Sequence, residues 1–278
     1  MTELRAGPLR CALRPELGGA IAGLWLGESP VLRSLPAPQL ASARQAACHP
    51  LVPYANRLGQ AAIVWRGTQE PQVRHSSDPP RAIHGLGWLR AWEVLDADAT
   101  SAMLAFEHRA DAAWPFAFDC SHTLRLQGGG LELTLAATNQ SREPAPMGLG
   151  WRLAFPGGAD AHLAFRAAGR WELDAQQHPL RRRPDAGVDA DAGALALDAC
   201  FDGWDGEARV RHRGLEVRLR SELTRLVVSR GVQEDALVLA PVSHVPNAVQ
   251  RQAGGPSAAD LGLALLAPGE TLVAQLRI

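Results

Sequence analysis

A histidine flanked by glycines and tryptophans is the first stretch of this sequence whose residue types could do chemistry. It spans Ile83 to Trp92 and reads IHGLGWLRAW. The glycines allow a tight turn and a close approach of the backbone to a ligand. His84 can exchange a proton or a hydrogen bond, and flat tryptophan rings suit the CH-rich face of a sugar or a hydrophobic core. A hydrogen-bonded packing role is the structural alternative for His84.

A second polar pair lies upstream, where an apolar segment ends. The segment begins at His49, reads HPLVPYANRL, and carries Asn56 and Arg57 near its end. Amide and guanidinium groups offer several N–H donors, and these suit the hydroxyl groups of a polar ligand. A surface ion pair is the structural alternative for Arg57.

Taken together, the two segments resemble the aldose 1-epimerase (galactose mutarotase) family. That family carries a Pro-x-x-Asn-Arg segment and, further along the chain, a His-Gly-x-x-Gly segment followed by Trp. This sequence has a close version of both in the same order, at residues 53–57 and 84–92, with one residue fewer between the two glycines. The resemblance continues at residues 148–150, 198–204, 241–248 and 266–270, and so covers nearly the whole chain.

The resemblance implies a fold, an activity and a set of binding residues. The fold is all-β, a large antiparallel two-sheet β-sandwich of the galactose mutarotase-like supersandwich type, expected as a single domain over residues 1–278. The activity is that of an isomerase of carbohydrate metabolism, which interconverts sugar anomers in a cleft across one sheet. Carried over onto this sequence, the sugar-binding positions fall on Asn56, Arg57, His84 and Asp198. A turn or capping role is the structural alternative for Asp198.

Both catalytic positions depart from the family pattern. Mutarotation requires a general acid at the ring oxygen and a general base at the C1 hydroxyl. The segment at residues 148–152 places Arg152 where the family has its acidic histidine, and the segment at residues 239–244 places Ala240 where it has its basic glutamate. Arginine stays protonated near neutral pH, and alanine has no proton acceptor. Since each partner contributes roughly 10²–10⁴-fold, we expect conventional activity to be weak or absent.

Three interpretations therefore remain open. In the first, the site is atypical but active, and other groups supply the acid and the base; the candidates are His122, His162, Glu234, Asp235 and His244. In the second, the protein is a non-catalytic carbohydrate-binding or sensor protein of the same fold. In the third, Arg152, which we expect near Arg57, pairs with a sugar phosphate or sugar acid through charge-assisted hydrogen bonds. A bond to a local carboxylate is the structural alternative for Arg152.

Composition narrows the classes of partner. The formal net charge is −1, which gives no electrostatic case for nucleic acid or an anionic membrane. No apolar stretch approaches the roughly 20 residues of a membrane span, and the N-terminus has no signal-peptide pattern, so we expect a cytoplasmic protein. The four cysteines are widely spaced and are expected as buried free thiols. We expect no metal and no cofactor, and a small-molecule sugar as the ligand; the oligomeric state stays open.

Hydrophobic periodicity also favours an all-β fold. Apolar and polar residues alternate at 102–106, 116–126, 131–135, 215–220 and 271–278, which is typical of strands with one buried face. No segment has a sustained apolar period of 3.6 residues, and 27 glycines and 20 prolines supply turns throughout. Residues 36–48 are expected as a short helix or a loop, and the charged residues 175–197 as a solvated loop.

Overall fold

The computed structural model describes residues 2–58, 62–65, 68–71, 82–112, 114–157, 161–175, 179–195, 198–230, 236–249 and 256–278. Within these ranges the chain is built of β-strands joined by turns, and no α-helix occurs. Single 3₁₀ turns lie at Ala37–Gln39, Ala43–Gln45, Gly87–Leu89 and Ala192–Ala194. The expected all-β fold class is confirmed. Residues 36–48 were expected as a short helix or a loop, and the loop describes them better, because they form only two single 3₁₀ turns before β5 (Cys48–Leu51).

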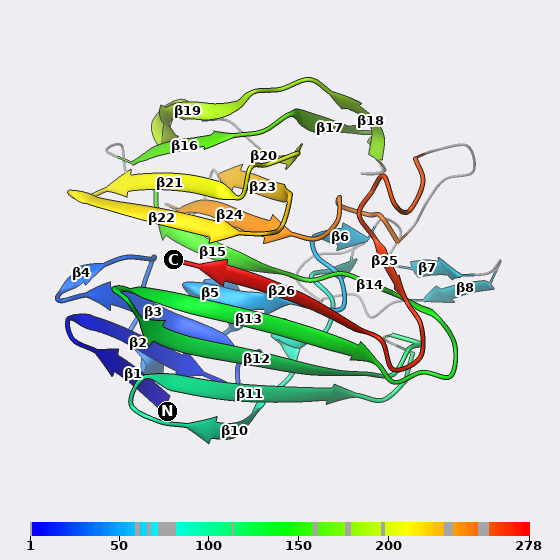
Figure 1. The fold of residues 1–278 in the computed structure, drawn as a ribbon, viewed down its shortest axis with the longest axis horizontal. Coiled ribbons are helices and arrows are strands. Elements are labelled where there is room, and N and C mark those ends of the chain that lie inside the picture. Colours follow the sequence, from blue (N-terminus) through cyan, green and yellow to red (C-terminus); the bar gives the residue numbers. More distant parts are fainter. Residues whose placement is uncertain are drawn as a thin grey trace.

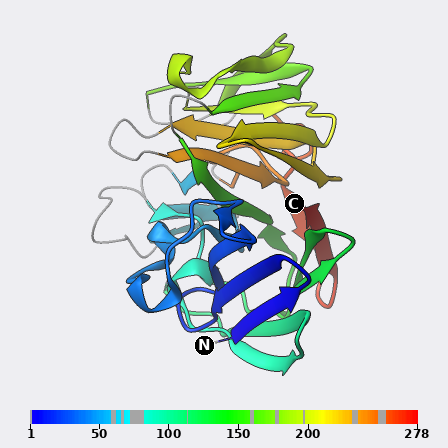
Figure 2. The same ribbon diagram turned by 90° about the vertical axis from the view of Figure 1, so that its left-hand side faces the viewer.

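The first large sheet contains eleven strands, and it is the sheet that carries the candidate site. In spatial order its strands are β1 (Thr2–Ala6), β2 (Leu9–Arg14), β3 (Ala20–Leu26), β5 (Cys48–Leu51), β15 (Gly150–Pro156), β24 (Ala236–Val242), β23 (Arg225–Arg230), β20 (Asp198–Asp202), β17 (Gly169–Leu173) and β18 (Pro179–Arg183), with β4 (Ser29–Pro30) paired to β3. Figure 2 shows its two ends, with the β1–β3 strands in blue at one end of the molecule and yellow and green strands at the other.

The second large sheet contains nine strands and, like the first, has antiparallel pairing between its described strands. In spatial order these are β10 (Glu93–Ala97), β11 (Ser101–His108), β12 (Phe118–Gln127), β13 (Gly130–Asn139), β26 (Thr271–Arg277), β22 (Leu215–Ser221), β21 (Glu207–His212), β16 (His162–Arg166) and β19 (Gly187–Asp191). Small two-stranded pairs join β14 (Ala145–Met147) to β25 (Ala264–Leu266), β6 (Arg57–Leu58) to β9 (Ala82–Ile83), and β7 (Ala62–Trp65) to β8 (Thr68–Pro71). Figure 1 shows how the strands of the two large sheets are arranged.

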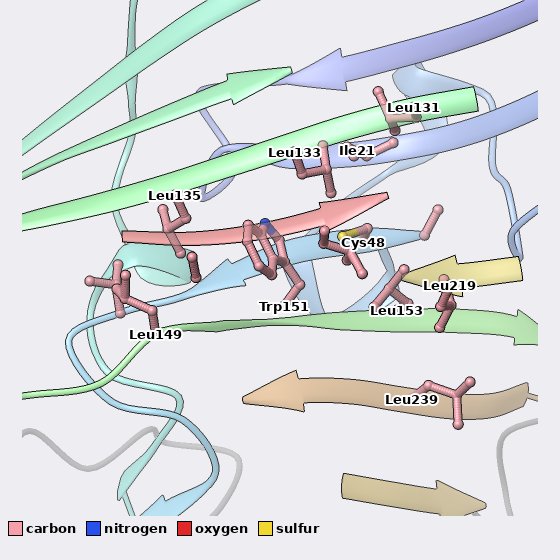
Figure 3. Packing of buried hydrophobic residues seen from close by; sticks show 14 of the residues in the cluster. Ile21, Cys48, Leu131, Leu133, Leu135, Leu149, Trp151, Leu153, Leu219 and Leu239 are labelled. Atoms are coloured by element: carbon pink, nitrogen blue, oxygen red, sulfur yellow. The ribbon is translucent and has the colours of Figure 1, made fainter. Parts of the chain in front are cut away.

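The main hydrophobic core lies between the two large sheets. Buried residues alternate with more exposed ones along β12 and β13, so each of these strands turns one face inward. Leu133 and Leu135 of β13 pack in one cluster with Trp151 and Leu153 of β15, and all four side chains are almost fully buried (Figure 3). Burial of each such side chain stabilises the fold by roughly 1.5–3 kcal/mol.

The alternating segments are confirmed as strands, and all five belong to the second sheet. They fall within or largely overlap β11, β12, β13, β22 and β26. Strands of the first sheet behave differently, because β24 is buried at every position from Ala236 to Val242. One face of β24 contributes to the core between the sheets, and the other joins a second apolar cluster with Val227 and Leu51. A strand buried on both faces has no alternation to detect.

The prediction of a solvated loop over residues 175–197 is wrong. Residues 179–183 form β18 and residues 187–191 form β19, each at the edge of a different large sheet. The arginines of β18 are exposed, and Arg181 Nε donates to Glu172 Oε2 of β17 at 2.7 Å. Charged side chains are common on edge strands because they discourage pairing with other chains. The charge run therefore marks two protected sheet edges.

We expect Gly148→Ala to lower the free energy of unfolding by about 1–3 kcal/mol through overpacking. A methyl group at Gly148 would lie 1.9 Å from Cδ2 of His244. That ring cannot easily move, because Nε2 of His244 accepts from the Ala55 N–H at 3.0 Å and Nδ1 bonds the Val245 carbonyl at 2.8 Å. Urea denaturation measures the change. The control is Gly193→Ala, where an added methyl meets nothing within 4 Å; equal effects of both substitutions would contradict the prediction.

Candidate functional site

A cleft of about 360 Å³ lies on the face of the first sheet that points away from the core. Among the described residues, its lining consists of Arg44, His49, Leu51, Asn56, Arg57, Ile83, His84, Trp88, Arg152, Asp198, Val227, Ser229, Arg230, Val238, Ala240 and Val242. All six residues singled out in the sequence, Asn56, Arg57, His84, Arg152, Asp198 and Ala240, are therefore brought together. Their roles toward a ligand stay predictions.

Strand register places the two unusual residues opposite each other on the floor of the cleft. β15 pairs with β24 so that Gly150 faces Val242 and Leu153 faces Leu239, and the same register sets Arg152 opposite Ala240. On its other side, Arg152 pairs with His49 of β5. Because side chains alternate between the faces of a strand, Trp151 and Leu153 enter the core while Arg152 enters the cleft.

Asn56 and His84 hold each other through the backbone at the cleft wall. The Asn56 N–H donates to Nδ1 of His84 at 3.0 Å, and the His84 N–H donates to the Asn56 carbonyl at 2.9 Å. Both residues have a left-handed backbone, with φ of 61° and 62°. Non-glycine residues in this region cluster at functional sites, where surrounding bonds fix them. Since Nδ1 of His84 accepts a hydrogen bond, the neutral ring carries its own hydrogen on Nε2 and presents a donor there.

The side chain of Asn56 has a fixed orientation as well. Its Oδ1 accepts from the N–H of Arg57 at 2.8 Å, and its amide nitrogen is left as the donating end. Asn56 and His84 can thus both offer N–H groups to hydroxyl oxygens. A hydrogen-bonded packing role was the structural alternative for His84. It accounts for the bond at Nδ1 and leaves Nε2 unexplained.

His49 is a cleft residue that the sequence did not single out. Its ring stacks on Trp88, with ring centres 5.7 Å apart and planes inclined by 22°, and meets His84 edge-on at 5.9 Å. Trp88 is fixed in turn, because its Nε1–H donates to the Ile83 carbonyl at 3.0 Å. The available signal was the polar residue in an otherwise apolar segment. Trp92, the other tryptophan of the segment from Ile83 to Trp92, instead packs in the core against Phe106.

Both cleft histidines are neutral at physiological pH. Burial, and then the neighbouring Arg152 guanidinium, lowers the pKa of His49 to about 3. Burial lowers the pKa of His84 well below its ordinary value, and His49, Arg152, Arg44 and Arg57 lower it further. General acids and bases work best when their pKa lies near the operating pH, so these rings are better placed to exchange hydrogen bonds than protons.

Of the five candidate replacement groups, the three histidines lie outside the cleft. His244 uses both ring nitrogens on backbone groups. His122 is buried in the core, where it accepts from the indole N–H of Trp151 at 3.1 Å. His162 lies in the second sheet between Asp189 and Asp191. The other two candidates, Glu234 and Asp235, lie outside the described residues.

The described lining carries a strong excess of positive charge. It holds four arginines, Arg44, Arg57, Arg152 and Arg230, and a single carboxylate, the exposed Asp198 at the start of β20. The four arginines are half-buried. With the histidines neutral, the formal charge of these side chains is three positive units.

Other kinds of site find no support in the described ranges. No group of three or more His, Cys, Asp or Glu residues there could hold a metal ion. All four cysteines are buried free thiols, as expected. No described helix is long and apolar enough to cross a membrane.

Comparison with known proteins agrees with this fold. The sequence matches the Aldose 1-epimerase family model over residues 2–278. It is 30% identical over 282 residues to the uncharacterized protein YphB of Escherichia coli (strain K12), with 94% of this chain and 92% of that protein covered. The chain therefore belongs to the aldose 1-epimerase family.

Solved structures share the fold over its whole length. One from Escherichia coli K12, assigned there only provisionally as an aldose 1-epimerase, superposes with a TM-score of 0.84 at 27% identity and covers 99% of this chain and 96% of that one. A galactose mutarotase-like protein from Clostridium acetobutylicum superposes with a TM-score of 0.83 at 16% identity, covering 99% of this chain and 93% of that one. At 16% identity, the likeness to the Clostridium acetobutylicum protein concerns the fold alone.

We expect the free energy of unfolding to decrease as the pH falls from about 6.5 toward 4. Burial lowers the folded-state pKa of His49 and His122 to about 3 and of His244 to about 4, from the ordinary histidine value of 6.5 that the unfolded chain retains. The unfolded chain binds protons that the folded protein excludes, so stability is complete above pH 6.5 and is lost below it, by on the order of 1 kcal/mol per pH unit for each histidine.

Urea denaturation at a series of pH values measures this dependence. His122→Gln keeps an acceptor for the indole N–H of Trp151 but removes one titrating group. It should therefore reduce the slope of the free energy of unfolding against pH by the contribution of one bound proton. A stability that stays flat between pH 6.5 and 4 would contradict neutral burial of these rings.

Proposed function

We propose that this protein binds a monosaccharide or a sugar derivative in the cleft and is a poor catalyst of anomer interconversion. The observation that carries this proposal is that Arg152 and Ala240 line the same cleft, at positions that the flanking strand register sets opposite each other. These are the positions at which the family resemblance expects the acid and the base. A permanent cation and a methyl group cannot pass a proton between the ring oxygen and the C1 hydroxyl.

Support for sugar binding comes from the polar groups of the wall. Nε2–H of His84 and the amide of Asn56 are donors fixed in direction, and Asp198 is an acceptor at the opposite side. Between them, beside Arg152, part of the floor is apolar, formed by Val227, Ala240 and neighbouring residues. Directed polar groups around an apolar floor suit a ring with hydroxyl groups on its rim and CH groups on its face.

Surroundings of Ala240 argue against rescue by a neighbour. Its side chain is only 5% exposed and belongs to an apolar cluster with Val227, Val242 and Cys200. Burial raises the pKa of the Cys200 thiol to about 12, so it is not a base near neutral pH. His49 and His84 have pKa values far below neutral and are weak bases. An enzyme with atypical acid and base groups is the second candidate, and the rate of mutarotation distinguishes the two.

We expect the wild-type protein to leave mutarotation of α-D-glucose and α-D-galactose nearly unaccelerated, as followed by polarimetry. The double variant Arg152→His, Ala240→Glu restores both proton-transfer groups on facing positions. It should accelerate the reaction by about 10²-fold or more over wild type, given the usual contribution of such groups. Each single variant serves as a control and should gain much less. Efficient wild-type catalysis would overturn the poor-catalyst proposal in favour of the atypical enzyme.

We expect His84→Gly to weaken sugar binding by about 10-fold or more, because a directed donor to a hydroxyl is lost. Glycine accepts the φ of 62° at this position without strain, although the bond from the Asn56 N–H to the ring is lost with the side chain. Isothermal titration calorimetry measures the dissociation constant. Arg213→Gly is the matched control, since Arg213 also has a left-handed backbone, with φ of 48°, in the hairpin turn between β21 and β22. Unchanged binding in His84→Gly would remove this residue from the site.

A further inference from the structure

A slot opens in the second sheet where β26 ends. β26 lies between β13 and β22, and it pairs with β22 only through Arg220 with Arg277 and Ser221 with Leu276. Within the part of the chain that the structure describes, no strand pairs with residues 215–219 of β22 on this side. Figure 1 shows the β21–β22 hairpin reaching beyond the end of β26, which is marked C. The sheet is therefore interrupted here, and one edge of β22 is open.

The floor of the slot is apolar and belongs to the first sheet. A cavity of about 480 Å³ lies here, and its floor is formed by Leu9 of β2, by Leu24 and Leu26 of β3, and by Val31. Leu9, Leu24 and Val31 are members of the main core, whereas Leu26 is 41% exposed. The slot thus leads from the surface to side chains of the core. Its described lining has no residue in common with that of the cleft.

One further strand segment fits the dimensions of this slot. β13 and β22 both lie next to β26, so they are two strand spacings apart, or about 9.6 Å. The register places Ile278 opposite Leu219 of β22 and opposite Leu131 of β13, with which it exchanges two backbone hydrogen bonds of 2.9 and 3.0 Å. Beyond Ile278, the line of β26 has four more positions beside β22, opposite residues 215–218, over a length of about 13 Å.

Alternation along β22 determines which side chains of an added segment would face inward. Val217 is buried and Leu215 is half-buried, whereas Glu216 and Arg218 are exposed on the outer face. Residues directly opposite each other on neighbouring strands point to the same face of the sheet. A segment that continues β26 therefore has two outward positions, opposite Arg218 and Glu216, and two inward positions, opposite Val217 and Leu215.

Positive charge gathers around the first outward position. A side chain there lies opposite Arg218, diagonally from Arg220, and two residues beyond Arg277 on the same face. These three arginines and Glu216 are the charged side chains of the described lining. Opposite charges on facing positions of neighbouring strands stabilise a sheet, and like charges destabilise it. The first outward position therefore favours an acidic side chain.

The arginines of the lining also have carboxylate neighbours on the outer face. Arg218 lies 2.9 Å from Glu216, and Arg220 and Arg277 each lie 3.4 Å from another glutamate. The three arginine side chains are between 47% and 62% exposed, and ion pairs at such sites contribute little to stability. Since each guanidinium has five N–H donors, it can bind a further carboxylate while its surface pair persists.

We propose that this slot binds an extended peptide segment of a partner protein by strand addition, with an acidic side chain at the first outward position and apolar side chains at both inward positions. The inference is independent of the cleft and its ligand. Backbone groups on the open edge of β22 supply the hydrogen bonds of a sheet pair, and the apolar floor and the arginines supply specificity. A strand that already belongs to a sheet carries a neighbour that the β12–β13 turn would exclude, so the segment is a chain end or a loop.

Extended versions of the full-length protein test whether the slot accepts such a strand. The residues Glu-Ile-Thr-Val are added after Ile278, where the line of β26 leads them into the slot at high effective concentration. We expect this extension to raise the midpoint of urea denaturation. Lys-Ile-Thr-Val, with the charge reversed, should raise it less, and Glu-Ser-Thr-Ser, without the apolar side chains, should leave it unchanged. Equal stability of the three extended proteins would overturn strand addition.

Fluorescence anisotropy with short labelled peptides tests binding in trans to the protein without an extension. The probe is acetyl-Glu-Ile-Thr-Val with a dye at its C-terminal end, and the two controls carry the same substitutions as the extensions. We expect the probe to bind about 5-fold or more tightly than either control, because the controls lose an opposite-charge pair or buried apolar area. Equal binding of the three peptides would overturn the predicted specificity.

Variants locate the peptide within the slot. Arg218→Glu should reverse the preference between the Glu and Lys peptides, and Leu26→Asp, at an exposed strand end where folding is at little risk, should weaken the binding of both. The matched controls are Arg142→Glu, exposed between β13 and β14, and Leu95→Asp, 55% exposed on β10; both should leave binding unchanged. An unchanged preference in Arg218→Glu would overturn the placement of the acidic side chain.

Two other occupants are outcomes of the same set of measurements. Hexanoate, octanoate and decanoate would identify an acyl-chain site if they bind where the peptides do not, with an affinity that rises about 4-fold for each added CH₂ group. Self-association in sedimentation velocity that is lost in Leu26→Asp would identify a second copy of this chain. Either result would overturn the peptide as the occupant.

Discussion

The alternation of side chains along β15, held in register by β5 and β24, is the constraint on which the rest of this structure depends. Trp151 and Leu153 are fully buried in the core, and Arg152 between them must therefore face the cleft. A slip of one residue would place a guanidinium group in the core and an indole in the cleft. The same packing that stabilises the sandwich thus fixes the orientation of the most unusual side chain of the site.

Electrostatics in the cleft follow from that placement. Arg152 keeps its charge at any ordinary pH. Burial lowers the pKa values of His49 and His84, the charge of Arg152 lowers them further, and both rings stay neutral. A site with fixed cations and neutral donors is suited to hydrogen bonding. Proton transfer needs a group that titrates near the working pH, and neither the arginine nor the neutral histidines meet this requirement. Binding and catalysis therefore make opposite demands on the residues at positions 152 and 240.

Sequence reasoning recovered the fold class and the six named cleft residues for different reasons. The alternation of apolar and polar residues predicted strands such as β13, because one face of the strand is buried and the other is more exposed to solvent. Alternation did not predict β24, because that strand is buried on both faces. The charged residues at 175–197 were predicted as a loop, whereas two edge strands lie there. The named cleft residues came from ordered motifs, whereas His49 was missed because a histidine in an apolar segment gives no hint of which face it occupies. Spatial register supplied that information.

The paired bonds between Asn56 and His84 have a consequence for how this family can diversify. Together with the pairing of Arg57 to Ile83 and of Leu58 to Ala82, they close the chain into a ring at the edge of the cleft. Asn56 and His84 both belong to the closure itself. The number of residues inside the ring then has little influence on where His84 points, since lengthening a closed loop adds only a small entropic term. Insertions and deletions inside the ring can therefore accumulate during evolution and leave Asn56 and His84 where they are.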